Sequence, residues 1–497
     1  MNKIGFDNEK YVSTQSEQIK KRIASFGGKL YLEFGGKLFD DYHASRVLPG
    51  FLPDSKMKML MQLKDQAEVV IVINANDIEK NKIRGDLGIN YADDTLRLVD
   101  VFRSHGLFVG SVVLTQFAGQ SSAVKFENRL QKLGIKTYRH YPIDGYPANV
   151  EHIVSDEGFG KNDYIETSHS LVVITASGPG SGKMATCLSQ LYHENKRGIQ
   201  AGYAKFETFP VWNLPLNHPV NIAYEAATAD LNDVNMIDPW HLQAYGKTTV
   251  NYNRDVEIFP VLEAMFKKIY ADCPYKSPTD MGVNMAGYCI MDDEAVQYAA
   301  KQEIIRRYYT ALCEQANGTA NTDEVFKLEL LMNKVGCTVN DRPPVAPALA
   351  LAEKTGEPAC AIELHDGRIV TGKTSALLGA CSAALLNALK AATGIDDEVL
   401  LISPQVIEPV QKLKTEHLGN KNPRLHTDEV LVALSISAVT DENAKKALDG
   451  LKDLDGCELH ASVILSPTDE KVLRKLGIRL TSEPVYQSTS LYINKKV

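Results

Sequence analysis

The sequence predicts an α/β fold with a mainly parallel sheet in its N-terminal region. Short apolar segments alternate with longer amphipathic segments through the first half of the chain. Some of the short segments, such as Val69 to Ile73, are apolar on both faces, which is typical of strands covered by helices on both sides. The expected strands are residues 29–34, 68–77, 106–114, 136–142, 170–178, 201–209 and 221–230.

The segments between these strands have the pattern of helices. Residues 93–106 and 123–134 place apolar side chains at helical spacing, and each ends in a glycine suited to a helix C-cap. The strand and helix patterns together predict an α/β domain over residues 1–252.

Two further regions follow this domain. Helical patterns at residues 256–270, 292–318 and 323–336 predict a helical subdomain over 253–340. The proline-rich segment 340–350 is the best linker candidate, because adjacent prolines resist both helix and sheet.

A separate C-terminal α/β domain is expected over residues 341–497. It opens on a strand, an Asp366-Gly367 turn and a second strand within 358–372, which is a strong hairpin signal. A long helix rich in Ala and Leu follows the hairpin. Further strands are expected at 398–404, 429–438 and 457–465.

Composition limits the class of partner. The chain has 497 residues, and 44% of them are hydrophobic, 23% are charged and the formal net charge is -8. A mildly acidic chain argues against nucleic-acid and membrane-surface binding, which need concentrated Lys and Arg. No apolar run approaches the length that spans a bilayer, and the N-terminus has no export pattern. We therefore expect a cytoplasmic protein whose partner is a small molecule, with the oligomeric state, including a homo-oligomer, left open.

Cysteines and histidines give no metal signature. Eight cysteines lie between Cys187 and Cys457 without a C-x-x-C pair, which favours reduced thiols, most of them in the core. The twelve histidines contain no H-E-x-x-H motif, so no metal ligands are assigned. No G-x-S-x-G motif is present either, which argues against a serine hydrolase.

Two glycine-lysine segments resemble phosphate-binding loops. The segment GRIVTGKT, residues 367–374, fits the pattern G-x-x-x-x-G-K-[ST] in every letter, but its first glycine belongs to the expected hairpin turn. The β-branched residues that follow this glycine do not readily turn successive N–H groups inward. We therefore interpret this segment as a hairpin.

The segment SGPGSGKM, residues 177–184, departs from the pattern twice but lies in the right context. An apolar strand precedes it, and a segment with helical spacing follows it, so free N–H groups and the positive end of a helix dipole would meet an anion there. The expected phosphate-binding residues of this P-loop-like turn are Gly178, Gly180, Ser181, Gly182 and Lys183. The alternative is a glycine-rich turn with an exposed lysine.

The identity of residue 184 bears on the cofactor. Met184 stands where P-loop enzymes keep the hydroxyl that holds Mg²⁺, and Thr186 comes two residues too late to replace it simply. ATP or another nucleotide with Mg²⁺ is the cofactor candidate, although the sequence does not identify the cofactor. The missing hydroxyl weakens the prediction of ATP hydrolysis more than that of phosphate binding.

Two residues are candidates for catalysis beside this loop. Asp230, at the end of the expected strand 221–230, is a candidate metal-holding or base carboxylate, with ordinary helix N-cap chemistry as the alternative. Lys205, in the expected strand 201–209, would add a second positive charge, with a solvated strand lysine as the alternative. Arg254 and Asp255, before a predicted helix, offer an anion clamp or a cap.

Several long segments together resemble a known family. They are EFGGKLFDDYHASRVLPGF, TASGPGSGKMATCLSQLYHE, NYNRDVEIFPVL, SPTDMGVNMAG and HASVILSPTDEKVLRKLGI. In these segments, which span essentially the whole chain, the sequence resembles a bacterial family of uncharacterised cytoplasmic proteins of about this length, a domain-of-unknown-function family. The resemblance implies a P-loop-like N-terminal region and a distinct C-terminal domain, without an activity or catalytic residues to transfer.

These features support two hypotheses for the function. The first is a nucleotide- or phosphometabolite-binding enzyme, a phosphotransferase or an NTP-dependent enzyme. The second is a non-catalytic sensor or assembly protein whose degenerate loop holds an anion.

Overall fold

The computed structural model describes residues 3–35, 38–39, 41–84, 88–319 and 322–487. The chain divides into two compact units, Ile4–Ala299 and a second unit from Ala300 onward, and the division falls inside α13 (Asp293–Ala316). From the sequence we expected boundaries after residues 252 and 340. Residues 253–299 instead belong to the first unit, because they supply both a helix and an edge strand to its sheet.

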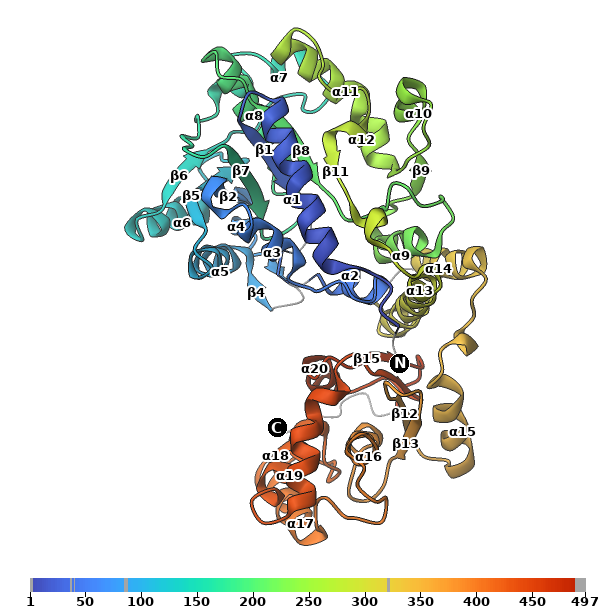
Figure 1. Cartoon of the computed structure of the whole chain (residues 1–497). Coiled ribbons are helices and arrows are strands. Elements are labelled where there is room, and N and C mark those ends of the chain that lie inside the picture. Colours follow the sequence, from blue (N-terminus) through green and yellow to red (C-terminus); the bar gives the residue numbers. More distant parts are fainter. Residues whose placement is uncertain (1–2, 36–37, 40, 85–87, 320–321, 488–497) are drawn as a thin grey trace. The chain divides into compact units, whose positions relative to one another are not determined.

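The first unit is organised around one seven-stranded parallel sheet (Figure 1). The strand order is β11-β8-β1-β7-β2-β5-β6, and every neighbouring pair is parallel. The strands are β1 (Leu30–Phe34), β2 (Ala67–Asn74), β5 (Phe108–Thr115), β6 (Lys136–Arg139), β7 (Leu171–Ala176), β8 (Gly202–Phe206) and β11 (Gly282–Val283). The prediction of a mainly parallel α/β sheet is confirmed.

Helices cover both faces of this sheet. Tyr31 and Leu32 point to opposite faces of β1, and both are fully buried. On the Tyr31 face, α8 (Lys183–Lys196) and α11 (Asn253–Tyr270) pack over β1, β2 and β7 in one apolar core. Elsewhere on the sheet, α1 (Asn8–Ser25) packs against β8 and β11, and α5 (Tyr91–Ser104) packs against β2 and β5.

Smaller elements complete the first unit. Its remaining helices are α2 (Tyr42–Val47), α3 (Ser55–Met61), α4 (Ala75–Glu79), α6 (Ser121–Lys132), α7 (Val150–Ile153), α9 (Pro219–Ala227), α10 (Pro239–Tyr245) and α12 (Pro278–Met281). Two short antiparallel ladders pair β3 (Ile83–Arg84) with β4 (Ile89–Asn90), and β9 (Asn235–Ile237) with β10 (Val250–Tyr252). In the described part of the chain, no helix is both long and apolar enough to cross a bilayer.

The second unit has its own four-stranded mixed sheet. The order is β13-β12-β14-β15, with β14 and β15 parallel and the other neighbours antiparallel. Its elements are α14 (Thr322–Val335), α15 (Val345–Thr355), β12 (Ala359–Glu363), β13 (Ile369–Lys373), α16 (Ala380–Thr393), α17 (Pro404–Lys412), α18 (Thr427–Ser437), α19 (Glu442–Asp449), β14 (Glu458–Ala461), α20 (Pro467–Lys475) and β15 (Arg479–Ser482). A separate C-terminal α/β region was expected and is found.

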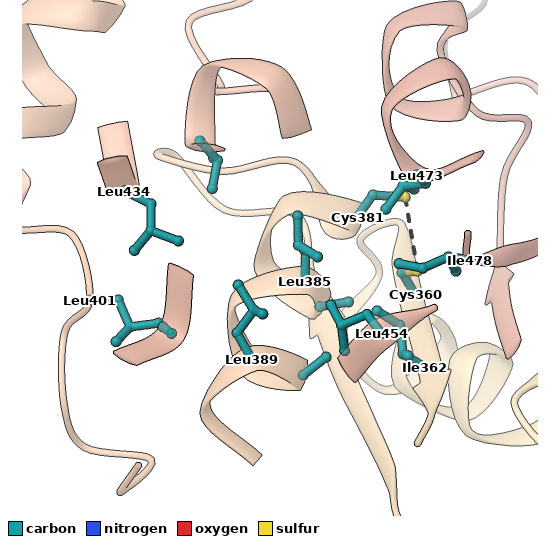
Figure 2. Close-up of a cluster of buried hydrophobic side chains, with 14 of the residues drawn as sticks. Cys360, Ile362, Cys381, Leu385, Leu389, Leu401, Leu434, Leu454, Leu473 and Ile478 are labelled. Atoms are coloured by element: carbon teal, nitrogen blue, oxygen red, sulfur yellow. Dashed lines mark hydrogen bonds between the residues drawn. The ribbon is translucent and has the colours of Figure 1, made fainter. Parts of the chain in front are cut away.

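The core of the second unit forms where α16 packs on the sheet (Figure 2). Leu385 and Leu389 of α16 face Ile362 of β12 in this cluster. Cys381 Sγ lies 3.9 Å from Cys360 Sγ, and this neighbour together with burial holds the pKa of the Cys381 thiol well above its ordinary value. All eight cysteines are free and six are buried, so most are core residues, as expected.

The segment 367–374 is a hairpin, as predicted. Gly367 has a φ of +83°, and its N–H donates to Leu364 O between β12 and β13. The backbone from Ile369 to Lys373 is committed to the β-ladder with β12. The match to the phosphate-loop pattern at this position therefore reflects a β-turn.

Three expected strands are wrong. Residues 221–230 form most of α9, which His218 caps and Pro219 begins, because proline fits the first helical position. Residues 429–437 lie in α18, where His426 and Glu429 form a capping box, and Ala438 is the C-cap of this helix. Residues 398–404 form no strand and lead into α17, which begins at Pro404. All three segments are apolar or rich in alanine, and such short runs do not distinguish strands from buried helices.

Candidate functional site

The β7–α8 loop, residues 177–182, lies at the middle of the large sheet. Strand β7 is the fourth of seven strands and lies between β1 and β2. The loop leaves its carboxyl end and leads directly into α8 at Lys183. In open parallel sheets, ligands bind at this edge, outside the carboxyl ends of the strands.

Neighbouring side chains hold the loop in place. Thr115 Oγ1 at the end of β5 donates to Ser181 O over 2.6 Å, and Asn74 Nδ2 at the end of β2 donates to Gly180 O over 3.3 Å. At the other end of the loop, the hydroxyls of Ser177 and Thr95 lie 3.2 Å apart. The carbonyl groups of Gly180 and Ser181 are thus bonded within the protein. The N–H groups of the loop remain available to another partner.

The loop presents several hydrogen-bond donors without partners. Within the described residues, the N–H groups of Gly178 and of residues 180–183 make no hydrogen bond. Ser181 is only 3% exposed, yet its hydroxyl has no partner there either. Positive φ angles at Gly180 (+70°) and Gly182 (+90°) produce this turn. Buried polar groups are normally paired, so these donors are suited to an anion at the helix N-terminus.

The helix position at which P-loop enzymes keep the hydroxyl for Mg²⁺ carries no hydroxyl in this chain. Met184 occupies that position, in the first turn of α8. Thr186, the nearest hydroxyl along the helix, donates to Gly182 O over 3.0 Å. In the described part of the chain, no cluster of three or more His, Cys, Asp or Glu side chains has a metal-binding arrangement.

The glycines of the loop give a test of its geometry. Alanine at Gly182 would have a strained φ and a Cβ 3.1 Å from Thr115 Cγ2, whereas alanine at Gly180 has similar strain and no atom within 4 Å. We expect Gly180→Ala to lower the free energy of unfolding by about 1–2 kcal/mol, the cost of a left-handed residue, and Gly182→Ala to lower it further. Urea denaturation of the full-length protein measures both. Equal losses would mean that the contact with Thr115 does not constrain the loop.

A second polar cluster lies two strands away from the loop. It consists of Lys205, Glu207, Tyr252 and Asp255, and we call it the lysine cluster. Lys205 Nζ contacts the Tyr252 hydroxyl and Asp255 Oδ2, and it lies 3.0 Å from Glu207 Oε1. The side chain of Lys205 is 12% exposed, so the alternative of a solvated strand lysine is wrong.

The elements of the fold explain this convergence. Lys205 of β8 is opposite Glu33 of β1, and Glu33 is opposite Ile174 of β7. Ile174 belongs to the apolar core under α8 and α11, so Lys205 lies on the sheet face that these two helices cover. Asp255 lies in the first turn of α11, where the sequence suggested a cap or an anion clamp. Tyr252 ends β10, and its ring also lies under Lys205 Nζ at 4.6 Å.

Burial and charge shift the ionisation of the cluster. Burial lowers the pKa of Lys205, but the charges of Asp255, Tyr252 and Glu207 outweigh burial and hold it well above its ordinary value. Burial raises the pKa of Glu207 to about 7, with Lys205 opposing and Asp255 adding to the rise. Glu207 is not among the residues predicted from the sequence, although its place two residues after Lys205, on the same face of an alternating strand, was a usable signal.

Asp230 lies apart from these contacts. It is exposed in a 3₁₀ turn (Ala229–Leu231) after α9, instead of at a strand end. Within the described residues it makes no hydrogen bond or ion pair, and we assign it no role. Arg254 instead pairs with the buried Asp233, with Nη2 2.6 Å from Oδ2.

The fold and the loop define a class of protein. It is an open, parallel α/β protein with a glycine-rich strand–loop–helix turn at the carboxyl edge of its central strand, joined to a smaller unit with a mixed sheet. Two family patterns match the chain: "Domain of unknown function DUF1846, N-terminal" over residues 4–336 and its C-terminal counterpart over residues 340–492. The chain belongs to this DUF1846 family.

Relatives extend over the whole chain. It is 59% identical to a UPF0371 protein of Corynebacterium aurimucosum over 494 residues, which cover 99% of each chain. It is 58% identical to the UPF0371 protein str1377 of Streptococcus thermophilus over 492 residues, which cover 99% of this chain and all of the relative. The resemblance to an uncharacterised bacterial family is therefore confirmed, and the family description carries no activity.

Proposed function

We propose that this protein binds a nucleotide or another phosphorylated metabolite at the β7–α8 loop, with Lys183 neutralising phosphate charge. The observation that carries the proposal is the set of unpaired N–H groups around the buried, unpaired hydroxyl of Ser181. A helix N-terminus adds the favourable end of its dipole. The proposed binding residues are Gly178, Gly180, Ser181, Gly182 and Lys183.

The lysine cluster favours an enzyme, a phosphotransferase or an NTP-dependent enzyme. Buried titratable groups whose ionisation is shifted are frequent at catalytic sites. Lys205 and Glu207 lie at the same edge of the sheet as the loop, since all seven strands are parallel. In this proposal the loop holds phosphate, and the cluster supplies charge and a proton-exchanging carboxyl.

Met184 favours a second function, a non-catalytic sensor or assembly protein that holds a phosphorylated ligand. ATP with Mg²⁺ is one candidate ligand, but neither Met184 nor the internally bonded Thr186 supplies the usual hydroxyl ligand. Turnover separates the two functions, because only an enzyme releases phosphate steadily from ATP or another member of a metabolite panel.

A thermal-shift screen tests the binding proposal. The panel contains ATP, GTP, sugar phosphates and inorganic pyrophosphate, each with and without Mg²⁺. A ligand present at about 100 times its dissociation constant stabilises the native state by about 2.7 kcal/mol. We expect Lys183→Ala to abolish the shift.

Lys196→Ala is the matched control for this screen. Lys196 lies at the other end of α8, where it pairs with Asp156 on the surface. This variant removes an equal charge from the same helix, but at the end away from the loop. It is therefore expected to keep the full shift. A shift that survives in Lys183→Ala, or no shift with any phosphate, would refute the binding proposal.

A further inference from the structure

We propose that Glu207 is the group that exchanges a proton with a phosphorylated ligand held at the β7–α8 loop, and that Lys205 and Asp255 position it. This inference rests on the proposed function and adds a role within it. The substrate class is a phosphorylated molecule with a basic oxygen or nitrogen about 10 Å, or two strand spacings, from its phosphate.

The backbone fixes the position of Glu207. Its N–H donates to Val283 O over 3.2 Å, which continues the β8–β11 pairing past the end of the strand. A Cβ built on Gly282 would lie 3.1 Å from Glu207 Oε2 and 2.5 Å from Trp212 Cζ2. The carboxyl group and the edge of the indole therefore both lie against the backbone of β11.

Glu207 Oε1 has Lys205 Nζ at 3.0 Å, but two buried donors in this neighbourhood have no hydrogen-bond partner within the described residues. They are Asn251 Nδ2 and Trp212 Nε1. Glu207 is 6% exposed and Asn251 is fully buried. The contact of both Trp212 and Glu207 with Gly282 places the indole beside the carboxyl group, and Trp212 O also accepts the N–H of Val250 in β10, the strand that carries Asn251. Two unpaired donors of this kind are suited to an acceptor group of a ligand.

The charges around Glu207 suit reversible proton transfer. Lys205 faces it from β8, and Asp255 faces it from α11. Tyr252 of β10 and Tyr224 of α9 also interact with its charge, and Glu33 of β1 acts on Lys205. Lys205 is a single cation between the carboxyl groups of Asp255 and Glu207. Its one positive charge balances only one ionised carboxylate, so the other carboxyl group retains its proton more easily. This agrees with a pKa of about 7 for Glu207.

The step is balanced without another reactant. The O–H bond of the protonated Glu207 breaks, and a new O–H or N–H bond forms on the ligand. The negative charge left on Glu207 is stabilised by Lys205 at 3.0 Å. The reverse step returns the proton, so the same carboxyl can act as base.

Infrared difference spectroscopy of the full-length protein tests this role. The spectrum of Glu207→Gln subtracted from that of the unsubstituted protein isolates the protonated carboxyl of Glu207, which we expect to titrate at about pH 7. Inorganic pyrophosphate, bound at the loop, should raise this midpoint by about one pH unit, the size expected for a charge about 10 Å away. In Lys183→Ala the midpoint should not move.

Each outcome decides between the two proposals. Calorimetry reports pyrophosphate binding directly. If pyrophosphate binds in a Lys183-dependent way but the midpoint stays fixed, or if no protonated carboxyl is seen at about pH 7, the role of Glu207 is refuted and the binding site stands. If pyrophosphate does not bind, the phosphate site fails and the role of Glu207 fails with it.

Two variants guard against an indirect effect. Glu207→Asp keeps the carboxyl and should retain a titrating band. Glu127→Gln removes a buried carboxyl that pairs with Arg139 at the far edge of the sheet. Pyrophosphate should shift the midpoint of Glu207 in this variant as it does in the unsubstituted protein, and a lost shift would refute the assignment.

Discussion

Replacing Glu458 with glutamine is expected to lower the free energy of unfolding of the C-terminal unit by about 3–5 kcal/mol, the usual effect of breaking a buried ion pair. Glu458 Oε2 lies 2.7 Å from Arg342 Nη1, and Arg306 and Arg479 are within 3.4 Å of Oε1. Arg342 is fully buried, so the variant leaves a cation without its charged partner.

The same pair predicts a pH dependence. Burial by itself would raise the pKa of Glu458, but the three arginines outweigh it and lower the pKa to about 2. The ionised carboxylate therefore stabilises the unit fully above its ordinary pKa of 4.5, and this stabilisation is lost as the pH falls toward 2. Glu458→Gln should remove this part of the acid sensitivity.

Hydrogen exchange of β12 and β14 in the full-length protein, together with urea denaturation, measures the change. Glu470→Gln is the control, because Glu470 makes an exposed pair with Arg474 on α20 of the same unit. Exposed pairs contribute only about 0–1 kcal/mol. If Glu458→Gln exchanged no faster than Glu470→Gln, the arginine network would contribute nothing to this unit.

Replacing Lys205 with methionine is expected to destabilise the N-terminal unit by a similar amount, about 3–5 kcal/mol at neutral pH. The methionine side chain fills much of the same volume but leaves Asp255 and Glu207 as neighbouring buried carboxylates without a cation. Without the opposing charge of Lys205, Glu207 then keeps its proton more strongly in the folded protein than in the unfolded chain.

The direction of the pH effect follows from that difference. A carboxyl whose pKa is raised by folding binds more protons in the native state, so the stability of Lys205→Met should fall as the pH rises. Urea denaturation at about pH 5 and about pH 8 measures this, and the loss should be larger at the higher value. Lys58→Met, which removes an exposed lysine of α3, is the control. A loss independent of pH would indicate a packing defect instead of unpaired carboxylates.

Much of the fold followed from local patterns. All seven strands of the large sheet except the two-residue β11 were predicted, and so were the helices closed by Gly106 and Gly134, whose φ angles are +75° and +71°. Residues 367–374 could be assigned to a hairpin because the Asp366-Gly367 turn signal was stronger evidence than the match to the phosphate-loop pattern. These features depend on backbone preferences within a few residues.

The wrong assignments have a common cause. Residues 221–230 and 429–437 are helical because capping at His218 and His426 and packing in the interior favour helices there. An apolar run of this length is compatible with either a buried strand or a buried helix. Asp230 was placed at a strand end for this reason, and the helix α9 moves it to an exposed turn.

The sequence by itself determined the strand–loop–helix turn at residues 177–183, since glycines, an apolar strand and a helical face are all local signals. Only the tertiary structure decided what surrounds that turn. The strand order places β1 between β7 and β8. The register of β8 and the position of the first turn of α11 bring Asp255 to Lys205, although the two residues are 50 apart in the sequence. The burial that raises the pKa of Glu207 likewise arises from packing between elements distant in sequence, and no local pattern records it.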